Sequence, residues 1–71
     1  LAYYAQGNTT KAIQLFEKAI ELDPDKVNAY INLGIAYYNS NFDKALIYKK
    51  KAASLGHKGT QDWLKKNGHD W

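Results

Sequence analysis

The chain has 71 residues, 45% of them hydrophobic, and its ten lysines outnumber its seven acidic residues, giving a formal net charge of +3. It contains no cysteine, which excludes disulfides and thiolate metal sites, and no arginine, which excludes the planar group used for bidentate recognition of phosphates and bases. No apolar run approaches the roughly 18 residues of a membrane-spanning helix.

The first predicted helix covers residues 9–22, and the scarcity of proline and glycine favours helices throughout the chain. Its apolar face is formed by five residues at steps of three and four: Ala12, Leu15, Phe16, Ala19 and Leu22. Asn8 is placed to cap this helix within a turn over residues 6–9. Pro24 ends the helix, because proline cannot continue it and pushes Asp23 toward an extended conformation.

A second helix is predicted over residues 26–39 with Asp25 as its N-cap, and a third over residues 42–55 with Asn41 as its N-cap. Gly56 follows the third helix at a position where a left-handed residue commonly terminates a helix.

A final short helix is predicted over residues 58–67, ending at Gly68 for the same reason as the third. Its apolar Trp63 and Leu64 are expected to face inward. Its polar residues are expected to face outward: Gln61, Asp62, Lys65 and Lys66. The three residues after Gly68 are not assigned to an element.

Two apolar stripes run along the second predicted helix. The packing stripe, expected to contact Phe16 and Ile20 of the preceding helix, consists of Tyr30, Leu33, Gly34 and Tyr37. The second stripe lies on a different face and consists of Asn28, Ile31, Ile35 and Tyr38. A helix that is apolar on two faces is either buried on both or offers one to a ligand. Ile31 and Ile35 are therefore either wedges between neighbouring helices or ligand contacts.

The chain repeats itself at an interval of 34 residues. The segment LAYY at residues 1–4 recurs as IAYY at residues 35–38. Further on the interval becomes 33, since Lys11–Ala12 corresponds to Lys44–Ala45. A loss of one residue inside a helix would rotate every later side chain by about 100°, so the loss is expected in the turn between two paired helices.

A helix pair with this period resembles the tetratricopeptide repeat family. The residues that carry the resemblance in the second repeat are Tyr30, Leu33, Gly34, Tyr37, Ala45 and Ala52. Those in the first repeat are Tyr3, Ala12, Phe16, Ala19 and Pro24. The resemblance covers residues 1–55 and implies an all-α fold, an α-solenoid of antiparallel helix pairs. It divides the chain into a truncated first repeat (1–26), a second repeat (27–57) and a capping helix with a tail (58–71).

The chain departs from the family pattern at several positions. The first repeat lacks the front of its first helix, and the second lacks a closing proline. Lys49 stands where the family usually has an aromatic residue, with Tyr48 beside it. The segment from Ala53 to Gln61, with LGH at its centre, is similar to the related Sel1-like repeat.

The resemblance implies a non-catalytic module that binds a protein or peptide in a concave groove lined by the first helix of each pair. The groove residues it implies are Tyr4, Ala5, Asn28, Ile31, Asn32, Ile35, Tyr38 and Asn39. Some relatives hold a terminal carboxylate with Lys and Asn residues. Asn32 and Lys65 approximate two members of that set, but Leu1 stands where another Asn is expected, so we do not predict a complete set.

Other functions have weaker motifs. The three lysines at 49–51 spread over about 200° of helix, which indicates a solvated surface and not a nucleic-acid site. His57 and His69 lack metal-ligand spacing and are expected to be loop residues, so neither a metal nor a cofactor is predicted. The NTT sequon at 8–10 matters only in a secreted protein. No signal peptide is visible, which makes a cytoplasmic, membrane-free setting the default expectation, although a targeting segment could lie upstream.

Two alternatives remain open at this point. Fewer than three repeats rarely form a stable array, so an apolar edge around Tyr3 and Phe16 could stack on a second copy, or exchange helices with it, and form a homo-oligomer. The chain could also be an accessory repeat of a larger protein with a catalytic domain elsewhere.

Overall fold

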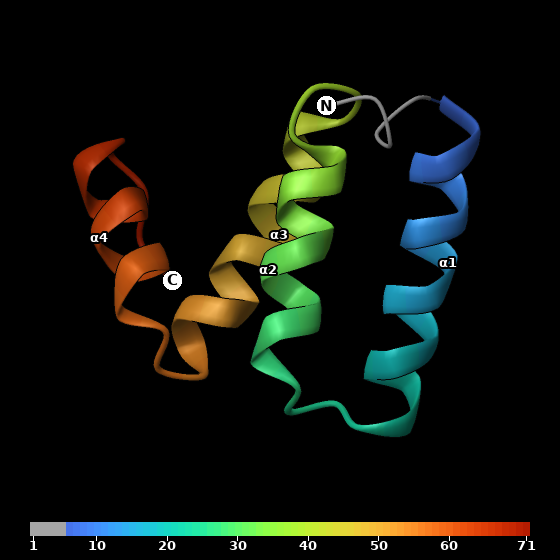
Figure 1. Ribbon diagram of the computed structural model, residues 1–71. Coiled ribbons are helices and arrows are strands. Elements are labelled where there is room, and N and C mark those ends of the chain that lie inside the picture. Colours follow the sequence, from blue (N-terminus) through green and yellow to red (C-terminus); the bar gives the residue numbers. More distant parts are fainter. Residues whose placement is uncertain (1–5) are drawn as a thin grey trace.

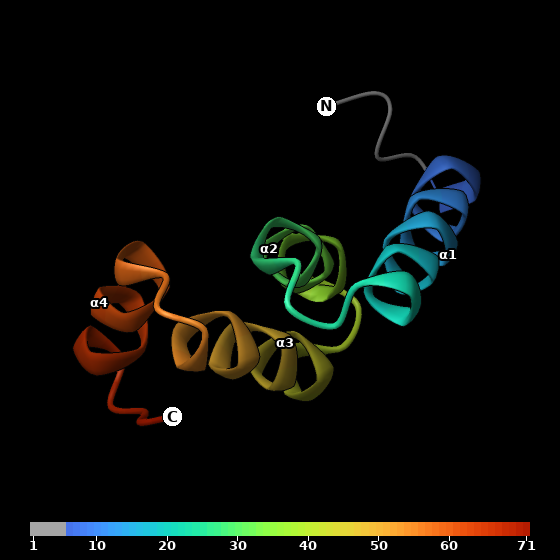
Figure 2. The ribbon, with the colours of Figure 1, turned by 90° about the horizontal axis from the view of Figure 1, so that it is seen from below.

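The computed structural model describes residues 6–71, with side chains from Thr9 onward. Four helices follow one another: α1 (Gln6–Leu22), α2 (Val27–Tyr37), α3 (Phe42–Ser54) and α4 (Lys58–Lys66). Each packs against its neighbour in the chain, and α1 and α4 lie at opposite ends of the row (Figures 1 and 2). No strand occurs between residues 6 and 71. The predicted all-α arrangement of helix pairs followed by a short last helix is confirmed.

The core lies between α2, α3 and α4. Its buried hydrophobic residues are Ala29, Tyr30, Leu33, Ala45, Ala52, Ala53 and Leu64. A side chain at Gly34 would place its Cβ 3.1 Å from Lys49 Cγ and 3.6 Å from the carbonyl oxygen of Ala45. Small residues at these crossings let the backbones approach closely, and side chains such as Leu33 fill the remaining space. The predicted packing stripe of α2 therefore faces the core.

The beginning of α1 differs from the prediction. The helix already includes Gln6, so residues 6–9 are helical and Asn8 is not its N-cap. Gly7 and Asn8 cost a helix about 1 kcal/mol or less each relative to alanine, which neighbouring helical turns can offset. The helix of the first repeat is consequently longer than α3, its counterpart in the second repeat.

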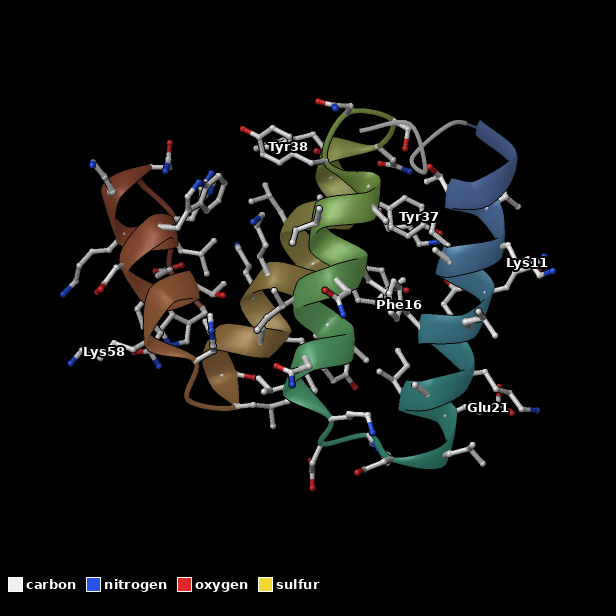
Figure 3. All side chains as sticks on the ribbon, in the orientation of Figure 1. Lys11, Phe16, Glu21, Tyr37, Tyr38 and Lys58 are labelled. Atoms are coloured by element: carbon white, nitrogen blue, oxygen red, sulfur yellow. The ribbon has the colours of Figure 1, made fainter. Side chains whose placement is uncertain are left out.

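The apolar face predicted for α1 is only partly covered. Phe16 and Ile20 are half-buried, and Phe16 projects into the space between α1 and α2 (Figure 3). Leu15 and Leu22 instead remain 63% and 77% exposed. These two leucines of the predicted apolar face are not covered, because α2 covers one side of α1 and no other described helix covers the side that carries them.

The connection between α1 and α2 is held by backbone and tyrosine contacts. α1 ends at Leu22, before Pro24, as predicted. Asp25 is not a cap, since α2 begins at Val27 after Lys26. The backbone N–H of Asp25 donates to Asp23 Oδ1 (3.2 Å) within the turn. The Tyr30 hydroxyl donates to the carbonyl oxygen of Pro24 (2.8 Å), which ties this turn to the buried face of α2.

The ends of α3 and α4 follow the predicted signals more closely. Asn41 Oδ1 accepts from the backbone N–H of Lys44 (3.2 Å), as an N-cap should. Gly56 and Gly68 have φ angles of 99° and 79°, the left-handed conformation expected after a helix. His57 is an unpredicted N-cap of α4, because its Nδ1 accepts from the backbone N–H of Thr60 (3.1 Å).

The last helix packs on α3 through one apolar side. Leu64 is fully buried and Trp63 is half-buried, as predicted. Asp62, Lys65 and Lys66 are exposed. Gln61 does not face outward as predicted, since its Nε2 donates to the carbonyl oxygen of Ala53 (2.9 Å). That carbonyl lies in the last turn of α3 and also accepts from the backbone N–H of Gly56 (2.9 Å), so Gln61 adds a second donor that ties α4 to the end of α3.

Candidate functional site

Six of the predicted groove residues lie along one side of α2 and the turn after it. We call this side the open face of α2; it consists of Asn28, Ile31, Asn32, Ile35, Tyr38 and Asn39. Ile35 and Tyr38 are 51% and 45% exposed, Asn28 and Asn39 are exposed, and Ile31 and Asn32 are half-buried. The chain therefore leaves this face accessible. Tyr4 and Ala5, the other two predicted groove residues, lie outside the described residues.

Two adjacent tyrosines at the end of α2 point to different sides of the helix. Figure 3 shows Tyr37 pointing toward α1 and Tyr38 pointing toward α4. The Tyr37 ring stacks on Tyr48 of α3, with centroids 5.9 Å apart, and the Tyr48 hydroxyl donates to Glu17 Oε2 of α1 (3.3 Å). Burial raises the pKa of Tyr48, so this hydroxyl stays protonated and remains a donor. Tyr37 thus belongs to the packing between α1, α2 and α3, and Tyr38 belongs to the open face.

Tyr38 joins an aromatic cluster that links α2, α3 and α4. Its ring lies edge-on to Phe42, with centroids 5.4 Å apart, and edge-on to Trp63 at 6.4 Å. Phe42 and Trp63 lie 6.5 Å apart. We call Tyr38, Phe42 and Trp63 the aromatic cluster. Edge-to-face contacts of this kind fix ring orientation, so Tyr38 is held in place while nearly half of it stays exposed.

Lys49 lies beside this cluster and not in a solvated lysine patch. Its stem crosses Gly34, as shown by the 3.1 Å approach of Lys49 Cγ to a Cβ placed there. Its Nζ lies 4.5 Å from the centre of the Trp63 ring and 5.8 Å from that of Tyr38. The prediction that residues 49–51 form a solvated surface is therefore wrong for Lys49. The Nζ of Lys51 also lies over a ring, 5.9 Å from the centre of Tyr30. In the family this position usually holds an aromatic residue. In this chain it holds Lys49, whose ammonium lies over the rings of Trp63 and Tyr38.

Asn32 and Lys65 lie on different helices, α2 and α4. Asn32 is on the open face of α2, whereas Lys65 lines a hollow at the C-terminal end of the chain together with His69, Asp70 and Trp71. His69 also stacks on Trp63, with centroids 6.4 Å apart and planes inclined by 10°. The hollow is thus formed by α4 and the residues that follow it, and Lys65 is one of its lining residues.

The described part of the chain limits other chemistry. Between residues 6 and 71, no three metal-ligating side chains gather in a group that could hold a metal ion. None of the described helices is long and apolar enough to cross a bilayer.

Comparison with known proteins identifies the family. The model of the family described as TPR repeat matches residues 1–41, more than half of the chain. No curated protein and no solved structure matches it. The match does not extend beyond residue 41. The Sel1-like resemblance and the division of the chain into repeats therefore stay predictions. Repeats of this kind generally mediate protein–protein interaction. This match shows that the chain, with its helix pairs and the small residues at their crossings, belongs to the tetratricopeptide repeat family.

Proposed function

We propose that the chain is a non-catalytic module that binds a peptide or protein segment along the open face of α2. The observation that carries this proposal is the exposure of Ile35 and Tyr38 on a helix whose other side is buried. Aromatic and large aliphatic side chains at the centre of such a surface supply most of the binding energy in peptide complexes.

The polar residues of the open face support the same occupant. Asn28, Asn32 and Asn39 each carry an amide that can both donate and accept a hydrogen bond. An extended peptide backbone presents alternating donors and acceptors of the same kind. α2 contains no charged residue, so an apolar or polar segment can approach it without displacing a strongly hydrated group.

Exposed apolar side chains adjoin one another at the end of α2. Tyr38 of the open face contacts Phe42, which is 43% exposed, and both contact Trp63 of α4. Contiguous apolar surface on a small protein commonly marks an interaction site, whereas single exposed residues do not. The proposed binding surface therefore runs from Ile35 to the aromatic cluster.

A peptide selection tests this proposal. Short random peptides are selected by display on the 71-residue chain, and the Kd of a selected peptide is measured for the wild type and for Ile35→Ala. Ile35→Ala is expected to weaken binding about five- to tenfold, a typical loss for a contact near the centre of an interface.

Ile47→Ala is the matched control. Ile47 is 64% exposed on α3, and two residues along a helix place it about 200° from both Ala45, which is buried, and Lys49. It therefore faces away from α2 and should leave the Kd within about twofold of the wild type. If Ile35→Ala instead lowers the free energy of unfolding sharply and leaves binding unchanged, Ile35 is a packing residue and the proposal is wrong.

A second candidate function is self-association through α1. Leu15 and Leu22 are seven residues apart, hence on one face, and both are largely exposed. Phe16, which was expected to form the edge, is half-buried, and Tyr3 lies outside the described residues. Sedimentation should detect a dimer that Leu15→Lys abolishes. A monomer over a wide range of concentration removes this candidate.

A further inference from the structure

Charge is distributed unevenly around the open face of α2. Residues 42–66, which include α3 and α4, contain seven lysines and two aspartates, a net charge of +5. α2 itself contains no charged residue. A segment that lies along α2 between α1 and α4 therefore meets a positive field from one side, and the field favours an acidic partner.

Lys49 brings one of these charges to the edge of the proposed binding surface. Its aliphatic stem packs across Gly34 on the core side of α2. Its Nζ then reaches the aromatic cluster, over Trp63 and near Tyr38. A cation held over ring faces is restricted in position while part of its surface stays free for another ligand. Lys49 is thus a positioned charge, unlike an exposed lysine whose ammonium moves freely in solvent.

Lys49 has no anionic partner within the described part of the chain. Burial lowers its pKa, and no carboxylate contributes in the opposite direction. The two aspartates of this half lie elsewhere, Asp43 in the first turn of α3 and Asp62 on the exposed side of α4. An ammonium that is partly removed from water and lacks a carboxylate gains more from binding one than a fully hydrated ammonium does.

We infer that the ammonium of Lys49 binds a side-chain carboxylate of the segment held on the open face of α2, so that the partner is an acidic peptide. This inference rests on the proposed function. The bound segment would carry an Asp or Glu over Lys49 and an apolar residue against Ile35 and Tyr38. Because the contact is made by a side chain of α3, it differs from recognition of a terminal carboxylate by Asn32 and Lys65.

A double-mutant cycle between protein and peptide tests the inference. The probe is a peptide selected as above, then acetylated and amidated so that it has no terminal carboxylate, together with its form in which the acidic residue is replaced by the corresponding amide. In the wild type this replacement should weaken binding about five- to tenfold. In Lys49→Met, which keeps most of the stem, the same replacement should change binding by less than about twofold.

Two further variants control for charge and folding. Lys18→Met removes an equal charge from the exposed surface of α1, at the other end of the row of helices (Figure 1), and should behave as the wild type. Lys49→Arg keeps the charge and should keep the dependence on the acidic residue. Circular dichroism establishes that each variant is folded, and raising the salt concentration should weaken binding of the acidic form more than that of the amide form.

The outcomes separate the inference from the proposed function. Selected peptides that lack a recurrent acidic residue, but whose binding depends on Ile35, would overturn the inference and leave the proposed function standing. An equal effect of the acidic residue on the wild type and on Lys49→Met would overturn it as well, since overall charge would then explain the preference. A failure to select any peptide would overturn both.

Discussion

The hydroxyl of Tyr30 offers a direct test of how the turn before α2 is held. Tyr30→Phe removes only this oxygen, which donates to the carbonyl oxygen of Pro24 over 2.8 Å. A hydrogen bond of this type contributes about 0.5–1.5 kcal/mol net. Because Pro24 is exposed, water can replace the lost donor and no buried acceptor is left unpaired. We therefore expect the free energy of unfolding to fall by about 1 kcal/mol.

Urea and thermal denaturation followed by circular dichroism measure this loss. For a domain of this size, about 1 kcal/mol corresponds to a decrease in Tm of roughly 4–8 °C. Tyr30→Ala should cost far more, about 3–5 kcal/mol as for other large aromatic residues, because the ring is buried and contacts Tyr48 at 6.2 Å. If Tyr30→Phe leaves the stability unchanged, the turn is held by its backbone alone. A loss as large as that of Tyr30→Ala would mean that the ring had moved.

Two further predictions concern side chains whose roles the structure assigns. His57→Ala removes the N-cap of α4 and should lower the free energy of unfolding, measured in urea, by about 0.5–2 kcal/mol. His57→Asp keeps a side-chain acceptor and should retain most of the wild-type stability. Equal stability of the two variants would contradict the capping role. Burial lowers the pKa of Lys49 below its ordinary value of 10.5, so the folded state loses this proton at a lower pH than the unfolded state does. The cost of burying the charge is present at neutral pH and disappears as the pH rises. The wild type should therefore gain stability relative to Lys49→Met on going from neutral pH toward 10.5, and a change in the opposite direction would show that the contact with Trp63 stabilises the charged form more than burial disfavours it.

Local signals predicted the elements that depend on a few neighbouring residues. Asn41 caps α3 and Gly56 and Gly68 follow their helices because the backbone at those positions requires a side-chain acceptor or a left-handed residue in almost any fold. The core position Leu33 was predictable from the packing stripe of the second helix, and Ala45 from the resemblance to the repeat family, in which a small residue stands at this place.

The errors concern positions where tertiary contacts decide. Asn8 is a good cap by type, yet α1 extends past it. Gln61 is polar and was expected in solvent, but it donates to the carbonyl oxygen of Ala53 at the end of α3, which also accepts from the backbone N–H of Gly56. Leu15 lies on the predicted apolar face, and only the number of helices beside α1 determines whether that face is covered. None of these outcomes is encoded in the spacing of residues along one helix.

The pair Tyr37–Tyr38 shows why part of the site was predictable and part was not. Two adjacent tyrosines on a helix point about 100° apart, so a helix that buries one must direct the other elsewhere, and the sequence alone places Tyr38 on a second face. What that face contains depends on residues distant in the chain: Phe42 and Trp63 complete the cluster, and Lys49 adds a charge. Had position 49 carried the aromatic residue usual in the family, the space between α2, α3 and α4 would hold another ring and no ammonium. A single lysine at a packing position therefore changes the chemistry that this surface can offer to a partner, while Gly34 and Ala45 keep the helices as close as the fold requires.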